Sequence, residues 1–411
     1  MISRRSLIKS LTAFYPLLLT HKVRANMIPS QQRIDSIIEE YSSQGNHRTA
    51  TDVDTLSGHW LADHIEKIGL APKLSRFNIQ RLDVDRADIN IGGTIIKGLP
   101  TFDGASTQPE GLSGSLGALG SGSDIGVIQL SPASIHPHYS EVARARSQSQ
   151  HRAILLVADT YFPGGGPVPL NAQSFGNPFG PPVLQIGNER WKEVSAAVSN
   201  NAMAKMIVTY HQTNTTAFNV EANIAGSQPG LSPIVVMTPR SGWWRCASER
   251  GGGIAILLEV MRAVKKGNPA RQVKFTANTG HELGHLGFEH FLKQDSGLVK
   301  DARLWLHLGA NIGASVDPGV LLQFSDQATR NELTKFINTE QLENYSTTPL
   351  GKRPLGEARA VFDGGGRYAS ILGANGLFHH PADIWPGAVN TKAISIYAKA
   401  LSAMIVSISQ Q

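Results

Sequence analysis

The segment that most constrains the fold is residues 272–291, QVKFTANTGHELGHLGFEHF, in which a strand pattern passes through a turn into a helix. Apolar and polar residues alternate over 273–278, and this period of two is typical of a half-buried strand. A Thr-Gly turn follows at 279–280. The pattern therefore places His281 and Glu282 at a strand-to-helix corner, a position where many hydrolases present metal ligands and a base to their substrate.

Residues 281–285, HELGH, also satisfy H-E-x-x-H, in which two His one helical turn apart bind zinc and the Glu between them activates water. Such a site needs both His on one continuous helix. The strand pattern before His281 leaves room for a helix only from about Leu283, so we favour a chance match over an independent zincin domain. A rearranged metal site that uses His281, His285 or His307 is kept as a further alternative.

Further motifs surround this corner. In chain order they are H-R-T-A-T at 47–51, N-I-A-G at 223–226, a strand pattern at 233–237, G-I-A-I-L-L-E at 253–259, the strand of 273–277 with G-H-E-L-G at 280–284, and F-H-H-P-A-D at 378–383. The series resembles the M28 family of zinc aminopeptidases, whose pattern is N-I-A-G, A-H-x-D-S, G-A-D-D-N-x-S-G-x-A-x-L-L-E, G-E-E-x-G-L-x-G and a closing Y-H-T-P-x-D. The resemblance covers roughly residues 30–410.

The resemblance implies an α/β fold with a mixed, mostly parallel sheet covered by helices and with the site at the carboxyl ends of the strands. At 411 residues the chain exceeds what one hydrophobic core usually serves. Residues 89–218 show their own alternation of strands and helices and resemble the smaller protease-associated (PA) domain inserted in many M28 enzymes. We therefore expect a peptidase-like domain of residues 26–88 and 219–411 with a PA-like insertion at 89–218. The Gly/Pro-rich segment 162–181 is interpreted as a solvated loop at the edge of that insertion.

The first 25 residues resemble a twin-arginine signal peptide. Residues 3–9, SRRSLIK, match the twin-arginine consensus, an apolar run follows at 11–19, and cleavage is expected after 23–25. The apolar run is too short to span a bilayer permanently, so no stable membrane insertion is expected. The sequence predicts export by the twin-arginine machinery to the periplasm or the exterior.

The net charge of the mature chain is close to zero. Five of the 38 Lys and Arg residues lie in residues 1–25, which contain no acidic residue. The mature chain therefore has 33 basic and 32 acidic residues. We therefore expect no nucleic-acid partner. The single Cys246 excludes an internal disulfide and is interpreted as a packing residue.

The resemblance matches the ligands of one of the family's two zinc ions but not the ligands of the other. The bridging Asp of the family falls on Glu249, and the second Glu of its G-E-E motif and its last His are matched by Glu282 and His379. The His of A-H-x-D-S falls on Pro239, and the Asp of the family's N-L-D-M-x-G motif falls within 309–310, which is Gly-Ala. The resemblance therefore implies a single zinc ion on Glu249, Glu282 and His379, with an open fourth position as catalytic zinc requires.

His281 falls on the family's general base, a Glu, and a neutral imidazole can take that role. His285 and His307 are other candidates, and Asp383 is expected to orient His379. Arg250 replaces an Asn of the family and can pair with Glu249 in place of a cation. Trp243 and Trp244 are candidates for an apolar substrate pocket.

The predicted function is that of an exported, metal-dependent hydrolase, a metallopeptidase or aminopeptidase acting on peptide N-termini or small amides through one zinc ion. The main alternative is a catalytically inactive M28-like protein that binds a peptide or another ligand. The rearranged metal site of the HELGH segment remains the further alternative.

Overall fold

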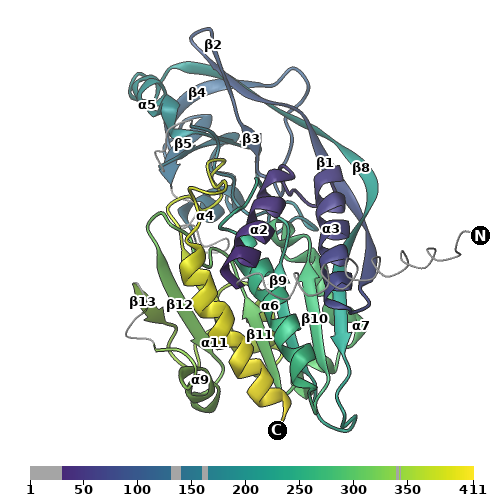
Figure 1. Ribbon diagram of the computed structural model, residues 1–411. Helices are drawn as coiled ribbons and strands as arrows, with labels where there is room; N and C mark the ends of the chain where they lie inside the picture. Colours follow the sequence, from purple (N-terminus) through teal and green to yellow (C-terminus); the bar gives the residue numbers. More distant parts are fainter. Residues whose placement is uncertain (1–29, 131–139, 160–164, 339–341, 343) are drawn as a thin grey trace, which may run out of the picture.

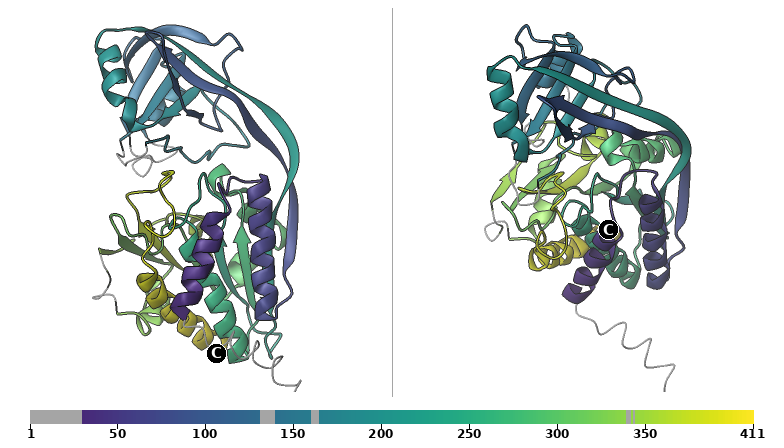
Figure 2. Two further views of the ribbon diagram at one scale, coloured as in Figure 1. Left: turned by 45° about the horizontal axis from the view of Figure 1, so that its top comes forward. Right: turned by 90° about the horizontal axis from the view of Figure 1, so that it is seen from above.

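The computed structural model describes residues 30–130, 140–159, 165–338, 342 and 344–411. The expected signal peptide lies outside the described residues. The described chain forms two lobes joined by a long two-stranded ribbon (Figures 1 and 2).

The lower lobe is built on a mixed sheet in the order β13-β12-β14-β11-β9-β10-β8. Its strands are β13 (Tyr345–Thr347), β12 (Gly319–Phe324), β14 (Tyr368–Ala374), β11 (Leu304–Leu308), β9 (Ile234–Pro239), β10 (Val273–Asn278) and the inner part of β8 (Met203–Ile224). The pairs β10–β9, β9–β11 and β11–β14 are parallel, whereas β12–β14 and β10–β8 are antiparallel. The predicted mixed, mostly parallel sheet is confirmed.

Helices cover both faces of this sheet (Figure 1). One face carries α2 (Ser30–Ser43), α3 (Asp52–Ile68), α6 (Gly251–Gly267) and α11 (Thr391–Ser409), which share the main core with the strands. The other face carries α7 (Leu286–Gln294), α8 (Leu298–Asp301) and α10 (Ala358–Asp363), packed around Trp305 of β11. A further helix, α9 (Gln327–Thr334), follows β12. Strands β9 and β11 are buried along their whole length, as expected for a sheet covered on both faces.

The upper lobe has its own core and its own strand order. Its elements are β2 (Thr94–Lys97), β3 (Leu99–Pro100), β4 (Leu112–Ala118), β5 (Ile125–Leu130), α4 (Glu141–Ser147), β6 (Ala153–Ala158), β7 (Val183–Ile186), the short helix η2 (Asn188–Arg190) and α5 (Trp191–Ser199). Strands β4, β5, β6 and β7 are parallel neighbours, and their apolar faces form a cluster separate from the main core.

A ribbon of β1 (Lys73–Ile91) and β8 connects the lobes (Figure 2). The two strands pair antiparallel from Lys73 opposite Glu221 to Ile91 opposite Ala204. The domain limits expected from the sequence, after residues 88 and 218, fall inside these continuous strands. The division into domains and the PA-like interpretation of the upper lobe stay predictions.

The corner after β10 differs in detail from the sequence expectation. Gly280 and Gly284 have φ values of 80° and 79°, and His285 also adopts the left-handed region, with φ 69°. A short 3-10 turn, η3 (His281–Leu283), stands where the helix was expected to begin, and α7 starts only at Leu286. Because left-handed residues interrupt the segment, HELGH is not one helical turn, which agrees with the rejection of a zincin domain.

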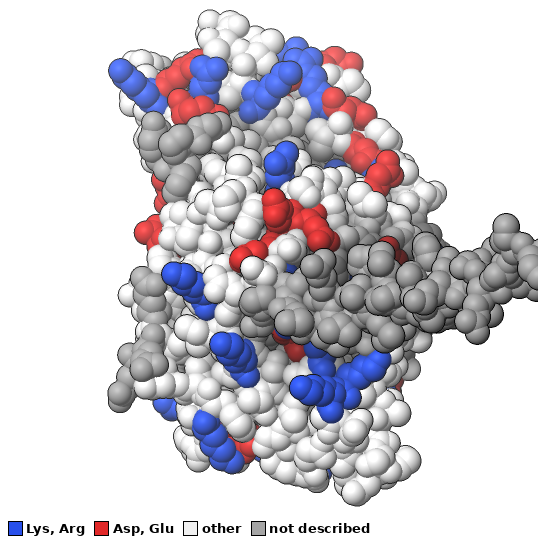
Figure 3. All heavy atoms as spheres, in the orientation of Figure 1, with Lys and Arg blue, Asp and Glu red and all other residues white. Residues whose placement is uncertain are grey.

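Lys and Arg are interspersed with Asp and Glu over both lobes on the face shown in Figure 3. Among the described helices, α11 alone is long and apolar enough to cross a membrane by length and composition, and half of its most apolar window is buried inside the fold. Core helices pass the same test, and α11 contributes Leu401 and Ile405 to the main core.

Candidate functional site

The predicted site residues gather at the carboxyl ends of the central strands. Ser241 follows β9, His281 follows β10, and Glu249 and Arg250 precede the first turn of α6. Carboxyl ends of parallel strands share one edge of a sheet, and this edge is where such folds place their sites. The structure therefore brings together side chains that lie far apart in the sequence.

Arg250 contacts both Glu249, its neighbour in the chain, and Ser241, which follows β9. Its Nη2 is 2.7 Å from Oε1 of Glu249, and its Nε donates to the backbone oxygen of Ser241 at 2.7 Å. Nε2 of His379 stands 3.6 Å from the same Oε1. The side chains of Arg250, Glu249 and His379 are all buried. Burial would lower the pKa of Arg250, but Glu249 and other nearby groups, Glu282 among them, together hold that pKa above the usual value.

The tautomer of His379 follows from its second nitrogen. Nδ1 lies 2.7 Å from the backbone oxygen of Pro169, so it carries the proton and donates. Nε2 of the neutral ring is then an acceptor that faces Glu249. Burial lowers the pKa of His379, which favours this neutral form.

Glu282 accepts hydrogen bonds from other residues, Thr49 and Ser241. Its Oε1 accepts from the backbone N–H and the hydroxyl of Thr49, at 2.7 and 2.6 Å, and its Oε2 accepts from the hydroxyl of Ser241 at 2.7 Å. The carboxylate is fully buried. Thr49 belongs to the H-R-T-A-T motif that the sequence analysis noticed, but its contact with Glu282 could not be derived from that motif.

The predicted zinc site on Glu249, Glu282 and His379 does not fit this arrangement. No three His, Cys, Asp or Glu side chains of the described residues are grouped so that they could hold a metal ion. Glu249 is paired with a guanidinium, and both oxygens of Glu282 are turned to Thr49 and Ser241. The expectation of three converging ligands is corrected accordingly, because a fixed positive side chain already compensates the carboxylate.

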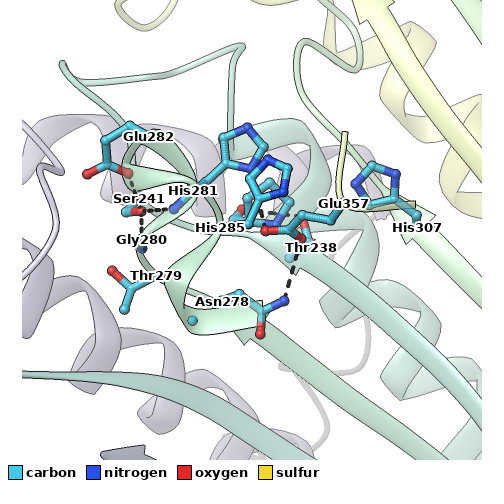
Figure 4. A network of polar contacts seen from close by, with 12 residues as sticks. Thr238, Ser241, Asn278, Thr279, Gly280, His281, Glu282, His285, His307 and Glu357 are labelled. Carbon is cyan, nitrogen blue, oxygen red and sulfur yellow. Dashed lines mark hydrogen bonds and ion pairs between the residues drawn. The ribbon is translucent and has the colours of Figure 1, made fainter. Parts of the chain in front are cut away.

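His281 lies in a second buried group with Glu357, which the sequence analysis missed (Figure 4). Nδ1 of His281 is 3.4 Å from Oε1 of Glu357, and the amide of Asn278 donates to Oε2 of Glu357 at 3.5 Å. Figure 4 shows Glu282 turned toward Ser241, while the imidazole of His281 points the other way, toward Glu357. No local motif marks Glu357, which lies 76 residues beyond His281.

Burial sets the protonation of this pair. It holds the pKa of His281 well below its usual value, with the Arg250 charge acting in the same direction, so the imidazole is neutral. Burial also raises the pKa of Glu357 to about 7. A neutral imidazole whose Nδ1–H faces a carboxylate has its Nε2 lone pair available to accept a proton.

His285 and His307 flank this pair. The ring of His285 stacks on that of His281 at 4.6 Å between centroids and lies 3.4 Å from Nη2 of Arg359. Nδ1 of His307 bonds to the hydroxyl of Ser370 at 2.8 Å, and burial lowers the pKa of His307 to about 3. These side chains do not form a metal-binding group in the described structure, and two guanidinium charges, of Arg250 and Arg359, lower the pKa of both His281 and His285. The rearranged metal site therefore finds no support in this geometry.

Asp383 has a structural role other than the predicted one. It accepts hydrogen bonds from the backbone N–H and hydroxyl of Ser248 and from the backbone N–H of Glu249, at 2.7 to 2.9 Å. It therefore fixes the entry to α6, whereas His379 is oriented by Pro169. Burial raises the pKa of Asp383 to about 7.

The two adjacent tryptophans contribute to packing around the site. Trp243 is buried and stacks on Phe102, with 4.9 Å between ring centroids. Nε1 of Trp244 donates to the backbone oxygen of His379 at 2.9 Å. Their expected place in a substrate pocket stays a prediction. Cys246 is buried, as expected for a packing residue, and burial raises the pKa of its thiol well above the usual value.

The segment after residue 165 covers the site and is not a solvated loop. Val168 and Ala172 are buried, and the N–H of Ala172 donates to the backbone oxygen of Glu282 at 2.7 Å. Nη2 of Arg359 donates to the side chain of Gln173 at 2.6 Å. The composition suggested solvent exposure, but Pro169, Ala172 and Gln173 bond to residues of the lower lobe. Residues 162–164 of the predicted loop lie outside the described residues.

This combination of sheet, covering helices and strand-end site defines the architecture of the zinc aminopeptidases. The solved structure of BSAP, described as a zinc aminopeptidase from Bacillus subtilis, superposes with a TM-score of 0.75 at 18% identity, over 93% of this chain and 95% of that one. A peptidase M28 precursor from Shewanella amazonensis superposes with a TM-score of 0.70 at 14% identity, over 96% of this chain and 97% of that one. At these identities the likeness establishes the fold.

The sequence itself matches the model of peptidase family M28 over residues 236–349. Aminopeptidase YwaD of Bacillus subtilis is 24% identical over 266 residues, which are 62% of this chain. The alignment spans 56% of the length of that curated relative. The predicted similarity to the M28 family is confirmed over residues 236–349, and the match to aminopeptidase YwaD agrees with it.

Proposed function

We propose that the chain hydrolyses an amide bond at a peptide N-terminus or in a small amide, with His281 as the general base. The observation that carries this proposal is the buried contact of 3.4 Å between Nδ1 of His281 and Oε1 of Glu357. The names of the relatives, which include aminopeptidases, support a peptide substrate.

The pair can move a proton without help from a metal. The neutral His281 accepts a proton from water at Nε2 while the water oxygen bonds to the amide carbon, and the Glu357 carboxylate orients the ring and stabilises the imidazolium that forms. The imidazolium then returns the proton to the amine nitrogen as the C–N bond breaks. The charge of Arg250 favours oxygen atoms that gain negative charge during the reaction. The solved relative is described as a zinc aminopeptidase, whereas the predicted ligands of this chain do not fit a metal ion in the described structure.

A second candidate function is binding of a peptide or small amide without turnover. Two observations favour it: the ion pair of Arg250 with Glu249 fills the predicted metal position, and the segment around Ala172 covers the edge of the sheet. In that case the site recognises polar groups of the ligand and His281 takes part only in binding.

The experiment that separates the two functions measures turnover and binding on the mature chain. Aminoacyl 4-nitroanilides and amino-acid amides are assayed with wild type, His281→Gln, Glu357→Gln and the matched surface variant His211→Gln. A general-base role predicts a loss of about 10²- to 10⁴-fold in kcat for His281→Gln, a smaller loss for Glu357→Gln and none for His211→Gln. No turnover by wild type, together with peptide binding in calorimetry, would favour the binding function.

We also propose export to the periplasm or exterior by the twin-arginine machinery. The support is the SRRSLIK sequence with its following apolar run. Replacing Arg4 and Arg5 by Lys should retain the protein in the cytoplasm, measured by cell fractionation. Unchanged export of that variant would contradict the proposal.

A further inference from the structure

We infer that Arg250 is a built-in substitute for the metal ion, so that this M28-type protein has a metal-free, permanently cationic centre. The inference concerns metal binding and holds whether the chain hydrolyses its ligand or only binds it. It rests on the position of the guanidinium, on the charges around it and on the buried polar atoms that it leaves without further partners.

The guanidinium lies among the positions that correspond to the family's ligands. It contacts Oε1 of Glu249, which stands in place of the bridging Asp, and the backbone oxygen of Ser241, two residues beyond Pro239, on which the family's first His falls. Gly242 packs directly against this arrangement: a Cβ there would lie in ordinary contact with Oε1 of Glu249 and Nε of Arg250, at 3.4 and 3.6 Å, and would clash only with Sγ of Cys246, at 2.7 Å. The cation is thus accommodated by the local packing.

A metal ion and this guanidinium exclude each other. A buried charge needs a partner, and breaking a buried ion pair is strongly destabilising. Glu249 provides that partner for Arg250, whose side chain is fully buried. A divalent ion bound to the same oxygen would be repelled by the guanidinium in a medium that screens poorly.

Without the guanidinium, the remaining groups are suited to a metal. Oε1 of Glu249 and Nε2 of His379 are buried and 3.6 Å apart, and beyond the ion pair with Arg250 neither has a hydrogen-bond partner in the described part of the chain. Zinc binds oxygen and nitrogen at about 2.0 to 2.2 Å, so one ion can bridge two atoms at this separation. Water would complete the coordination. Arg250 is therefore the residue that decides between a metal and a fixed positive charge.

The guanidinium of Arg250 also keeps an N–H group without a hydrogen-bond partner in the described part of the chain. Nη1 of Arg250 is buried and has no hydrogen-bond partner among residues that the structure describes. A guanidinium donates preferentially to carboxylate and carbonyl oxygens. A ligand that reached Nη1 would therefore be favoured if it brought a carboxylate or an amide oxygen.

The test compares metal content and thermal stability of the mature protein and two variants. Wild type should contain far less than one zinc per chain by elemental mass spectrometry, and added zinc should leave its Tm unchanged. Arg250→Met should bind about one zinc per chain. Its Tm should be lower without metal and should rise by several degrees when zinc is added, because the ion binds the folded state.

The matched control is Arg240→Met. Arg240 is also fully buried and forms an ion pair of 2.6 Å with Asp54, and the hydrogen bonds of its side chain go to Asp54 and Phe218 and to none of the predicted ligands. Its loss should lower the Tm to a similar degree, and zinc should not restore it. The comparison separates a gain of metal binding from a general effect of removing a buried Arg.

About one zinc in the wild type, lost in Glu249→Gln or His379→Ala, would overturn the inference. So would a folded Arg250→Met that takes up no zinc. If Arg250→Met does not fold, the test uses the wild type and Arg250→Lys. A rise in the Tm of either protein on addition of zinc contradicts the inference. An unchanged Tm in both proteins supports it. Hydrolytic activity enters none of these readouts, so failure here is distinct from failure of the proposed function.

Discussion

At the scale of single residues, the site depends on which buried groups are charged. Arg250 and Glu249 form a charged pair, whereas His281, His307 and His47 are held neutral by burial. A buried neutral imidazole makes the stability of the fold depend on pH, because the unfolded chain binds the proton more tightly.

His47 allows a direct test of this dependence. Its ring stacks on Tyr41 at 3.8 Å, its Nε2 bonds to the backbone oxygen of Tyr41 at 3.0 Å, and burial lowers its pKa to about 3. Since this pKa lies below the unfolded value of about 6.5, the contribution to stability is complete above pH 6.5 and is lost as the pH falls toward 3.

We expect His47→Gln to reduce the difference in unfolding free energy between pH 7 and pH 5 by about 2 kcal/mol. The measurement is urea unfolding followed by fluorescence at both pH values. His211→Gln, on the exposed ribbon strand β8, should leave the difference unchanged. An equal pH dependence in wild type and His47→Gln would show that His47 is not the group responsible.

At the scale of elements, the turn between β10 and α7 places the two halves of the site. Gly280 reverses the chain so that His281 points to Glu357 and Glu282 to Thr49 and Ser241. Its N–H donates to the hydroxyls of Thr49 and Ser241, which ties the turn to the Glu282 network. A Cβ at this position would lie 2.9 Å from Cβ of Leu286.

Gly280→Ala should therefore destabilise the fold for two reasons, a positive φ of 80° and a steric clash. Gly93→Ala is the matched control, because Gly93 has φ 92° but a Cβ added there would meet nothing within 4 Å. The strain alone costs about 1 to 2 kcal/mol, so Gly280→Ala should lose clearly more unfolding free energy than Gly93→Ala in denaturant titrations. Equal losses would mean that α7 moves freely away from the turn.

At the scale of the whole molecule, two cores share one pair of strands. The upper core around Leu155 and the main core around Leu306 have no buried residue in common, and β1 and β8 pass from one lobe to the other (Figure 2). The upper lobe nevertheless contacts the site, because Pro169 and Ala172 bond to His379 and to Glu282. Stability of the upper lobe should therefore affect the site without changing the sheet beneath it.

Leu155→Ala removes a fully buried side chain from the upper core and should cost about 2 to 5 kcal/mol. We expect faster hydrogen exchange in β5, β6 and the segment around Ala172, with β9 and β11 unaffected. Leu306→Ala, of the same chemistry in the main core, should speed exchange in β9 and β11 instead. A uniform increase in both lobes for Leu155→Ala would show that the molecule unfolds as one unit.

The sequence alone determined the scaffold, because periodicity and motif spacing are local. The alternation over 273–278 predicted β10, and the motif series predicted the M28-type sheet with a strand-end site. Only the tertiary structure decided which side chains of the site contact one another and which of them are charged. The partners of Glu282 and His281, Thr49 and Glu357, are 233 and 76 residues away, and the side chain of Arg250 turns onto Glu249. Burial then fixes which of these groups carry charge, since desolvation and nearby charges depend on the folded surroundings.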